Sequence, residues 1–196
     1  MPNIMIHEQV GYLLSKKLNI DSYNYYLGLL APDSPNIDGL APKEERWLAH
    51  VRKKDLQEWK ESLKDFYTKE KNNPNYKIDF IIGYVIHILT DIIYDEYFYK
   101  TIIEKIKKDY NCKDAHIIMR NDMDNYSFQE ISYIYDILKG RSDTYDINYI
   151  TKKVMNEWKE KEISKEIRNN NSKYINEKLI KKLTKIVEKE LNFILK

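Results

Sequence analysis

One stretch of this chain predicts a helix that is apolar almost all round and still carries three ionisable residues. The sequence IIGYVIHILTDIIYDEYF covers residues 81–98 and is rich in isoleucine. His87, Asp91 and Asp95 follow one another at intervals of four, which on a helix places them within about 80° of one another. Because a helix that is apolar all round is normally buried, we expect one imidazole and two carboxylates to lie inside a hydrophobic core.

Buried carboxylates on this helix need compensating cations. A carboxylate that leaves water without a partner costs several kcal/mol, so arginine or lysine side chains of other helices, or a metal ion, must meet it. Gly83 stands one turn before His87, and its missing side chain predicts room beside the imidazole for another group. The stripe therefore indicates either an ion-paired network or a metal site.

The rest of the chain also predicts helices. Only five glycines and five prolines occur in 196 residues, and four of the prolines precede residue 43. Apolar residues at helical spacing predict helices over residues 4–18, 23–30, 47–70, 77–108, 114–138, 143–167 and 172–195. Between the second and third lies APDSPNIDGLAPKEE, a polar, proline-rich loop. We predict an all-α, single-domain bundle of six or seven helices spanning residues 1–196.

Charge and cysteine content limit the class of protein. The 33 basic and 31 acidic residues nearly cancel, so the net charge does not indicate a nucleic-acid-binding protein. Residues 151–196 hold 13 basic and seven acidic side chains, which is typical of a solvated helix face and only weakly favours an anionic partner. The single cysteine, Cys112, excludes an internal disulfide. Without a signal-like start or an uncharged run of 18 residues, we expect no transmembrane helix and a cytoplasmic location.

The chain has four histidines, and three of them are candidates for metal ligation. His7 lies among apolar neighbours, His50 follows WLA near the start of a predicted helix, and Asp33 lies in the stiff segment APDSPN. Together with the stripe, these residues supply three imidazoles and three carboxylates. Nitrogen and oxygen ligands without a thiolate suit zinc or a similar divalent ion. The candidate metal ligands are His7, Asp33, His50, His87, Asp91 and Asp95.

Several better-known sites are excluded by their spacing. HEQVG at residues 7–11 begins like a zincin motif but lacks the second histidine. No histidine is followed directly by aspartate, as in the His-Asp phosphohydrolases, and none has glutamate three residues before it, as in the di-iron carboxylate bundles. The chain also lacks GxSxG and a glycine-rich phosphate loop.

Four segments in order, PNIMIHEQVGYLL, YYLGLLAPDSPN, ERWLAH and GYVIHILTD, resemble the zinc-dependent phospholipase C family, which is related to the S1/P1 nucleases. The similarity covers about residues 1–100, and the chain looks especially like the short, non-secreted bacterial members. The resemblance implies an all-helical phosphodiesterase with a metal cluster in a cleft. Carried over by position, it implies His7, Asp33, His50, His87 and Asp91 as ligands. In that family Asp91 would bridge two metals, and Asp33 would also be a candidate general base.

The chain departs from the family at the third metal position. The secreted members add a histidine soon after the His-x3-Asp and then a His-x3-Glu, whereas here His116 is followed by Arg120. Asp95 is the predicted substitute because it shares the stripe. The other carboxylates that could substitute are Glu96, Asp122 and Asp124. The secreted members also use their N-terminal residue as a ligand, which leaves an equivalent role for Met1 open. We expect two divalent ions, zinc in the first instance, rather than three.

The predicted function is hydrolysis of a phosphate ester by a metal-activated water, as in phospholipase C, with Asp33 as the catalytic residue. The metal site would come from residues 1–100, and helices within 114–196 would complete the bundle. The expected partner is a phosphate-ester substrate, with phospholipid as one candidate. Two alternatives stay open. One is a non-catalytic helical protein with a structural metal or an ion-paired network. The other is a P1-type nuclease, for which nucleic acid would be the partner.

Overall fold

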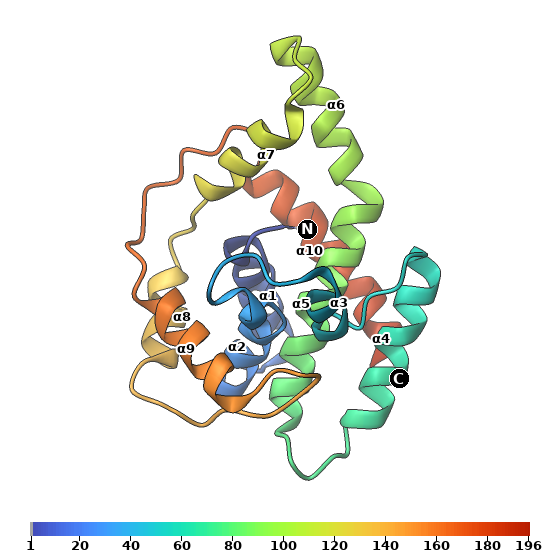
Figure 1. The fold of residues 1–196 in the computed structure, drawn as a ribbon, viewed down its shortest axis with the longest axis vertical. Helices are drawn as coiled ribbons and strands as arrows, with labels where there is room; N and C mark the ends of the chain where they lie inside the picture. The colour runs from blue at the N-terminus through green and yellow to red at the C-terminus, as the bar shows by residue number, and fades with distance from the viewer. Residues whose placement is uncertain (1) are drawn as a thin grey trace.

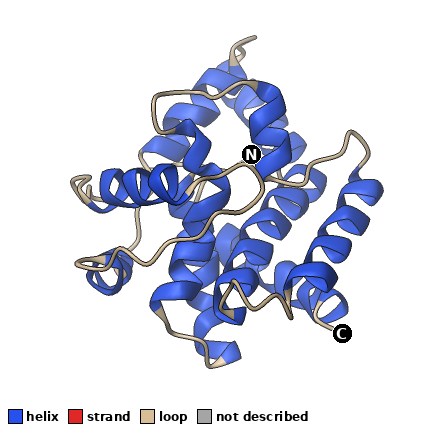
Figure 2. Cartoon of the chain, turned by 60° about the horizontal axis from the view of Figure 1, so that its bottom comes forward, coloured by secondary structure: helices blue, strands red, loops and turns tan. Residues whose placement is uncertain are grey.

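The computed structural model describes residues 2–196, which form helices joined by loops (Figure 1). Figure 2 shows helices joined by loops, and within the described residues the only β-type pairing is an isolated bridge between Ile147 and Ile150. The all-α class is confirmed. The helices are α1 (Ile4–Leu18), α2 (Tyr23–Leu30), α3 (Lys43–Ala49), α4 (Leu56–Glu70), α5 (Ile78–Tyr97), α6 (Tyr99–Tyr110), α7 (Ala115–Asp124), α8 (Ile131–Leu138), α9 (Lys152–Ile163) and α10 (Glu177–Ile194), with one 3-10 helix, η1 (Ala31–Asn36), between α2 and α3.

The predicted count of six or seven helices is too low, because the described residues form ten α-helices. The predicted helix 47–70 is broken after α3, where Val51 adopts a φ of 43°. The predicted helix 77–108 bends at Phe98, which ends α5 and begins α6. The predicted helix 114–138 is interrupted between α7 and α8. The segment 143–167 is helical only over α9, and Asn148 and Tyr149, which precede that helix, both have positive φ in a tight turn. Each break is a local backbone event that apolar spacing does not record.

Helix starts follow ordinary capping chemistry. The side chain of Asn3 accepts a hydrogen bond from the backbone of Ile6 at the start of α1. Ser22 does the same for α2 and Asp55 for α4. These bonds satisfy backbone donors that the first helical turn leaves free. They fix where α1 and α2 begin, and both helices keep the bounds that the sequence predicts.

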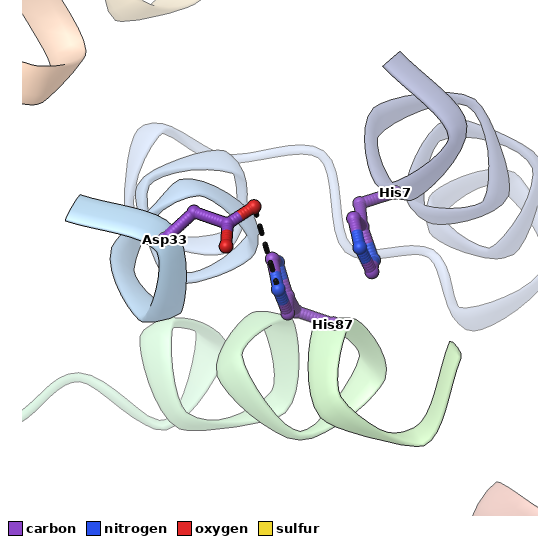
Figure 3. A group of neighbouring side chains, drawn as sticks. All are labelled: His7, Asp33 and His87. Atoms are coloured by element: carbon purple, nitrogen blue, oxygen red, sulfur yellow. Dashed lines mark ion pairs between the residues drawn. The ribbon is translucent and has the colours of Figure 1, made fainter. Parts of the chain in front are cut away.

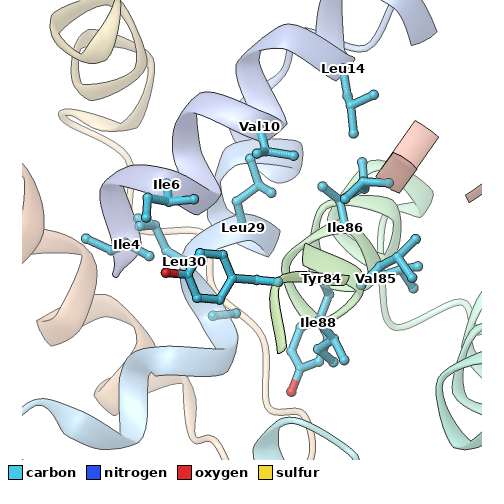
Figure 4. Packing of buried hydrophobic residues seen from close by; sticks show 14 of the residues in the cluster. Ile4, Ile6, Val10, Leu14, Leu29, Leu30, Tyr84, Val85, Ile86 and Ile88 are labelled. Carbon is cyan, nitrogen blue, oxygen red and sulfur yellow. The ribbon is translucent and has the colours of Figure 1, made fainter. Parts of the chain in front are cut away.

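Helix α5 is the centre of the molecule. All of its residues from 80 to 94 are buried, and α1, α2, α4, α6 and α10 pack against it. Figure 4 shows side chains of α1 and α2, among them Val10 and Leu29, packed with Val85 and Ile86 of α5. The C-terminal helix α10 packs on α1 and α5 and so covers the same core. No helix among residues 2–196 has the length and apolar character needed to span a bilayer.

Helices α2 and α5 cross at two glycines. A Cβ atom added to Gly28 would overlap the carbonyl oxygen of Phe80, and one added to Gly83 would overlap the carbonyl oxygen of Tyr25. The backbones are therefore as close as glycine allows. This corrects the expectation for Gly83: the space beside it is filled by the backbone of α2 and is not left for a ligand. The crossing also brings Leu29 beside His87.

We predict that Gly83→Ala destabilises the protein by about 1–3 kcal/mol, because the added methyl group meets backbone atoms that cannot rotate away. Gly11→Ala is the matched control, since the three atoms nearest to its Cβ would all belong to the side chain of Leu29 and not to backbone. Urea unfolding followed by circular dichroism measures both changes. An unchanged stability of Gly83→Ala, or an equal loss in the control, would contradict the close crossing.

Candidate metal centre

Five of the six predicted ligand residues meet in the core. His7 comes from α1, Asp33 from η1, His50 from the residue that ends α3, and His87 and Asp91 from α5. Figure 3 shows His7, Asp33 and His87 reaching one place from three different elements. The rings of His7 and His87 are stacked, with centroids 3.7 Å apart and planes 4° from parallel. Residues that are distant in sequence therefore surround one point in the core.

The contacts within this cluster pair imidazole nitrogens with carboxylate oxygens. Asp91 Oδ1 lies 3.4 Å from Nε2 of His7, and Asp91 Oδ2 lies 3.5 Å from Nε2 of His50 and 3.9 Å from Nε2 of His87. Asp33 Oδ1 lies 3.5 Å from Nε2 of His50, and its Oδ2 lies 3.9 Å from Nε2 of His87. The two oxygens of Asp91 thus face different imidazoles.

The orientation of two imidazoles is set by backbone carbonyl groups. Nδ1 of His50 donates to the carbonyl oxygen of Arg46 at 2.8 Å, and Nδ1 of His87 donates to that of Leu29 at 2.6 Å. A carbonyl oxygen can only accept, so Nδ1 carries the hydrogen in both rings. In the neutral ring, the lone pair of Nε2 then points toward the carboxylates. Metal-binding histidines are commonly oriented by such a second hydrogen bond.

The facing atoms in the cluster lack hydrogen bonds. Nε2 of His7, His50 and His87 and both oxygens of Asp91 are buried and have no hydrogen-bond partner among the described residues. Native proteins rarely leave buried polar atoms in this state. Their separations of 3.4–3.9 Å exceed the usual hydrogen-bond range of about 2.7–3.2 Å. Two ligands about 2.1 Å from one zinc ion at the tetrahedral angle lie about 3.4 Å apart, so the spacing suits ligands that share a cation.

Two sets of ligand atoms converge closely enough to hold an ion. One set comes from His50, His87 and Asp91, and the other from His7, Asp33 and His87, with the atoms of each set within 4.8 Å of one another. The sets share Nε2 of His87, which has a single lone pair and can bind only one of two ions. Asp91 also reaches toward His7 through its second oxygen. A carboxylate that offers one oxygen to each side is the arrangement that a bridging ligand needs.

The protonation states of both carboxylates and of His87 suit a cation. His50 differs, because Asp33 and Asp91 raise its pKa against the effect of burial, so a metal ion would have to displace a proton from this ring. Burial alone would raise the pKa of Asp33, but the adjacent His50 and His87 lower it below its usual range. The pKa of Asp91 is likewise lowered by His7 and His50 against the effect of burial. Burial and the neighbouring His7 lower the pKa of His87 to about 3. At neutral pH both carboxylates are thus ionised and His87 is neutral, which are the forms that bind metal ions.

Asp33 connects the cluster to solvent. Its side chain is 14% exposed, whereas those of Asp91 and the three histidines are at most 1% exposed. Asp33 lines a cleft of about 860 Å³. Four basic side chains also line this cleft, namely Arg46, Arg52, Lys54 and Arg120. Two further carboxylates, Asp95 and Asp124, line it as well, so its basic side chains are in excess. The cluster therefore opens on one side, through Asp33, toward a cleft with more basic than acidic walls.

Asp95, the sixth predicted ligand, belongs to neither set of converging atoms. Its Oδ2 accepts a hydrogen bond from Nη2 of Arg52 at 3.0 Å, and its side chain lines the cleft. The reason is its position one turn beyond Asp91, where α5 leaves the core and Asp95 becomes 20% exposed. For this residue the structure shows the arginine pairing that the sequence left open.

The other candidates for a third site lie elsewhere. Glu96 pairs with Lys60, and Asp122 accepts hydrogen bonds from Ser172 and from the backbone that follows it. Asp124 lines the cleft but is in neither ligand set. The Nδ1 atom of His116 lies 2.7 Å from the hydroxyl of Tyr99. Met1 lies outside the described residues.

Sequence reasoning missed two buried glutamates. Glu8 and Glu162 are at most 1% exposed, and neither oxygen of Glu8 has a hydrogen-bond partner among the described residues. Burial, reinforced by the charge of Glu162, raises the pKa of Glu8 well above its usual range. Both oxygens of Glu162 accept hydrogen bonds from Lys165. The sequence does contain a signal for the burial of Glu8, because Glu8 stands four residues after Ile4 and so lies on the same face of the predicted helix.

Comparison of the chain with protein-family models, with curated proteins and with solved structures finds no match. The resemblance to the zinc-dependent phospholipases C therefore stays a prediction. The arguments that follow depend on the geometry of the cluster and its cleft.

We predict that His87→Ala lowers zinc affinity at least 10-fold, because both ligand sets lose an imidazole. The helices should form as before, as judged by circular dichroism. His116→Ala is the matched control, since His116 is exposed and outside both sets. Equilibrium dialysis with zinc, followed by elemental mass spectrometry, compares the variants. Wild-type affinity in His87→Ala would exclude this cluster as the metal centre.

We predict that Glu8→Gln stabilises the metal-free protein at pH 8, because the neutral amide replaces a carboxyl group whose pKa burial raises. A raised pKa means that, above the ordinary glutamate value, the folded state holds a proton that the unfolded state has released, so stability falls as pH rises. The gain should be smaller at pH 4, below the ordinary glutamate pKa of 4.5, where most of the unfolded state is protonated as well. Urea unfolding in a chelator at the two pH values measures it, and a gain independent of pH would contradict the raised pKa.

Proposed function

We propose that this chain is a metal-dependent phosphoesterase whose metal centre consists of His7, Asp33, His50, His87 and Asp91. The observation that carries the proposal is a set of buried ligand atoms without hydrogen-bond partners, which opens through Asp33 into a cleft with more basic than acidic walls. The donors are nitrogen and oxygen atoms, which favours zinc or a similar divalent ion. The resemblance in residues 1–100 supports the same reading and favours two ions.

The open side of the centre favours catalysis over a purely structural role. A structural zinc site is closed by four protein ligands, whereas a catalytic site keeps a position for water or substrate. Here Asp33 lies at the edge of the cleft, with every other ligand behind it. The position next to Asp33 is thus the place where water and substrate would meet.

The distances disfavour an ion-paired network without metal. In such a network the imidazoles would donate to the carboxylates at hydrogen-bond distance, because buried charges need good geometry to offset desolvation. The observed nitrogen–oxygen separations are 3.4 Å and more, and the buried atoms are left unsatisfied. Arg52 and Asp95 form an ordinary charged hydrogen bond of 3.0 Å close by.

A bound divalent ion would lower the pKa of a coordinated water and polarise the phosphoryl oxygens. The part of this chain is to position the reactants. Asp33 is ionised, and its carboxylate can accept a hydrogen bond from the attacking water and so orient it. Because the pKa of Asp33 is lowered, its carboxylate is a weak base. We therefore assign Asp33 the role of orienting the water in preference to that of a general base. The basic walls of the cleft attract an anionic substrate and offset charge that develops on the phosphoryl oxygens.

The proposed substrate class is therefore an anionic phosphate ester. The resemblance makes phospholipid one candidate substrate. A P1-type nuclease activity is the alternative within the same chemistry, and it would act on single-stranded nucleic acid. Both need the metal centre, so a general phosphodiester tests them together before individual substrates are compared.

We predict that the zinc-loaded protein hydrolyses bis(p-nitrophenyl) phosphate and that a chelator abolishes this activity until zinc is restored. Asp33→Asn should lower kcat about 100-fold or more, because the oriented carboxylate is lost. Asp38→Asn, an exposed position in the same segment, is the matched control. If the zinc-loaded wild type cleaves neither this ester nor phospholipid vesicles nor single-stranded DNA, the proposed function is wrong.

A further inference from the structure

We propose that Arg52 binds the phosphoryl group of the substrate and that Asp95 positions it. This inference extends the proposed function, because it names the protein group that would recognise an anionic phosphate or phosphonate beside the metal centre. Arg52 stands two residues after the ligand His50 and lines the same cleft as Asp33.

The guanidinium of Arg52 is held from two directions. Its Nη2 donates to Oδ2 of Asp95 at 3.0 Å. Its central carbon lies 4.5 Å from the centroid of the buried Trp59 ring and 5.9 Å from that of Trp47. The side chain is only 24% exposed. An arginine fixed by a carboxylate and stacked on an aromatic ring loses little further entropy when it binds a ligand.

Most donors of Arg52 are still available for a ligand. A guanidinium has five N–H donors, and the bond to Asp95 is the only hydrogen bond that this side chain donates among residues 2–196. The planar fork of N–H groups matches two oxygens of a phosphate. Since Arg52 and Asp33 line the same cleft, a ligand within it has access to both residues.

The pairing also accounts for the third ionisable residue of the α5 stripe. His87 and Asp91 face the ligand cluster, whereas Asp95 holds Arg52 one turn later. One helix would thereby set the distance between the metal ligands and the phosphate-binding group. Asp95 acts through Arg52 and is therefore a positioning residue.

The other basic residues of the cleft are less well prepared. Lys54 and Arg120 are exposed, so binding would cost them more side-chain entropy. Arg46 donates from Nε to the carbonyl oxygen of Ala41, but among the described residues it has neither the carboxylate partner nor the aromatic ring that holds Arg52. Their charges add to the attraction for anions, but Arg52 combines restricted motion with free donors.

The test uses phenylphosphonate, a phosphate-like anion that cannot be hydrolysed, and the zinc-loaded full-length protein. Isothermal titration calorimetry should give a Kd at least 10-fold weaker for Arg52→Ala than for the wild type, because hydrogen bonds between charged groups contribute this much. Arg52→Lys should also weaken binding, since it keeps the charge but not the fork. Asp95→Asn should weaken it less than Arg52→Ala does, because the guanidinium stays but loses its charged partner. Lys53→Ala, an exposed neighbouring lysine, should bind like the wild type.

Zinc content and thermal unfolding, measured on the same samples, separate this proposal from that of the metal centre. Arg52→Ala and Arg52→Lys should keep the zinc content of the wild type. Wild-type affinity in both, or equal weakening in Lys53→Ala, would overturn the role of Arg52. If the wild type holds no zinc, the metal centre fails. The same titrations of the metal-free proteins then decide on Arg52, and the absence of phosphonate binding by the wild type at millimolar concentration would overturn its role.

Discussion

The carboxylate of Asp91 lies at the centre of an apolar helix bundle, and neither of its oxygens has a hydrogen-bond partner among the described residues. Burial of an unpaired carboxylate is among the larger costs that a fold can carry. The surrounding side chains that can compensate are the imidazoles of His7, His50 and His87, which come from three separate elements. The arrangement of α1, α3 and α5 is therefore tied to the chemistry of this one group, and a shared cation is the partner that its geometry best fits.

The neighbouring structure holds these imidazoles in place through backbone contacts. The glycine crossing of α2 and α5 brings the carbonyl group of Leu29 to His87. At the end of α3, Nε1 of Trp59 donates to the carbonyl oxygen of His50 at 2.9 Å. The hydroxyl of Tyr84 donates to the carbonyl oxygen of Ala49. The turn after α3 is thus fixed where it presents His50. Such a supporting set of hydrogen bonds is what precise ligand placement requires.

Much of this arrangement follows from the sequence, because helical spacing and capping are local. The bounds of α1 and α2, the burial of α5 and the convergence of five of the six proposed ligand residues match the sequence analysis. The breaks at Val51 and Phe98 could not be predicted, since they lie in backbone torsion angles, which the spacing of apolar residues does not record. The environment of Gly83 was misjudged for a similar reason, because a missing side chain looks the same whether a ligand or another helix fills the space.

Asp95 and Glu8 mark the limits of spacing as evidence for a site. Asp95 shares the stripe of α5, but the register does not reveal where the helix leaves the core. Glu8 lies beside a predicted ligand, and its burial depends on the packing of α8 and α9 against the N-terminal helices. In both cases the environment of the side chain depends on which element, distant in sequence, packs against it.

The most direct test of the metal centre is the metal content of the wild-type chain, purified without a polyhistidine tag, dialysed against zinc and then against metal-free buffer. Elemental mass spectrometry should find two equivalents of zinc per chain, one for each oxygen of Asp91. One equivalent would contradict the bridging role of Asp91. A content near zero would contradict the metal centre itself and leave the buried cluster as a network of imidazoles and carboxylates alone.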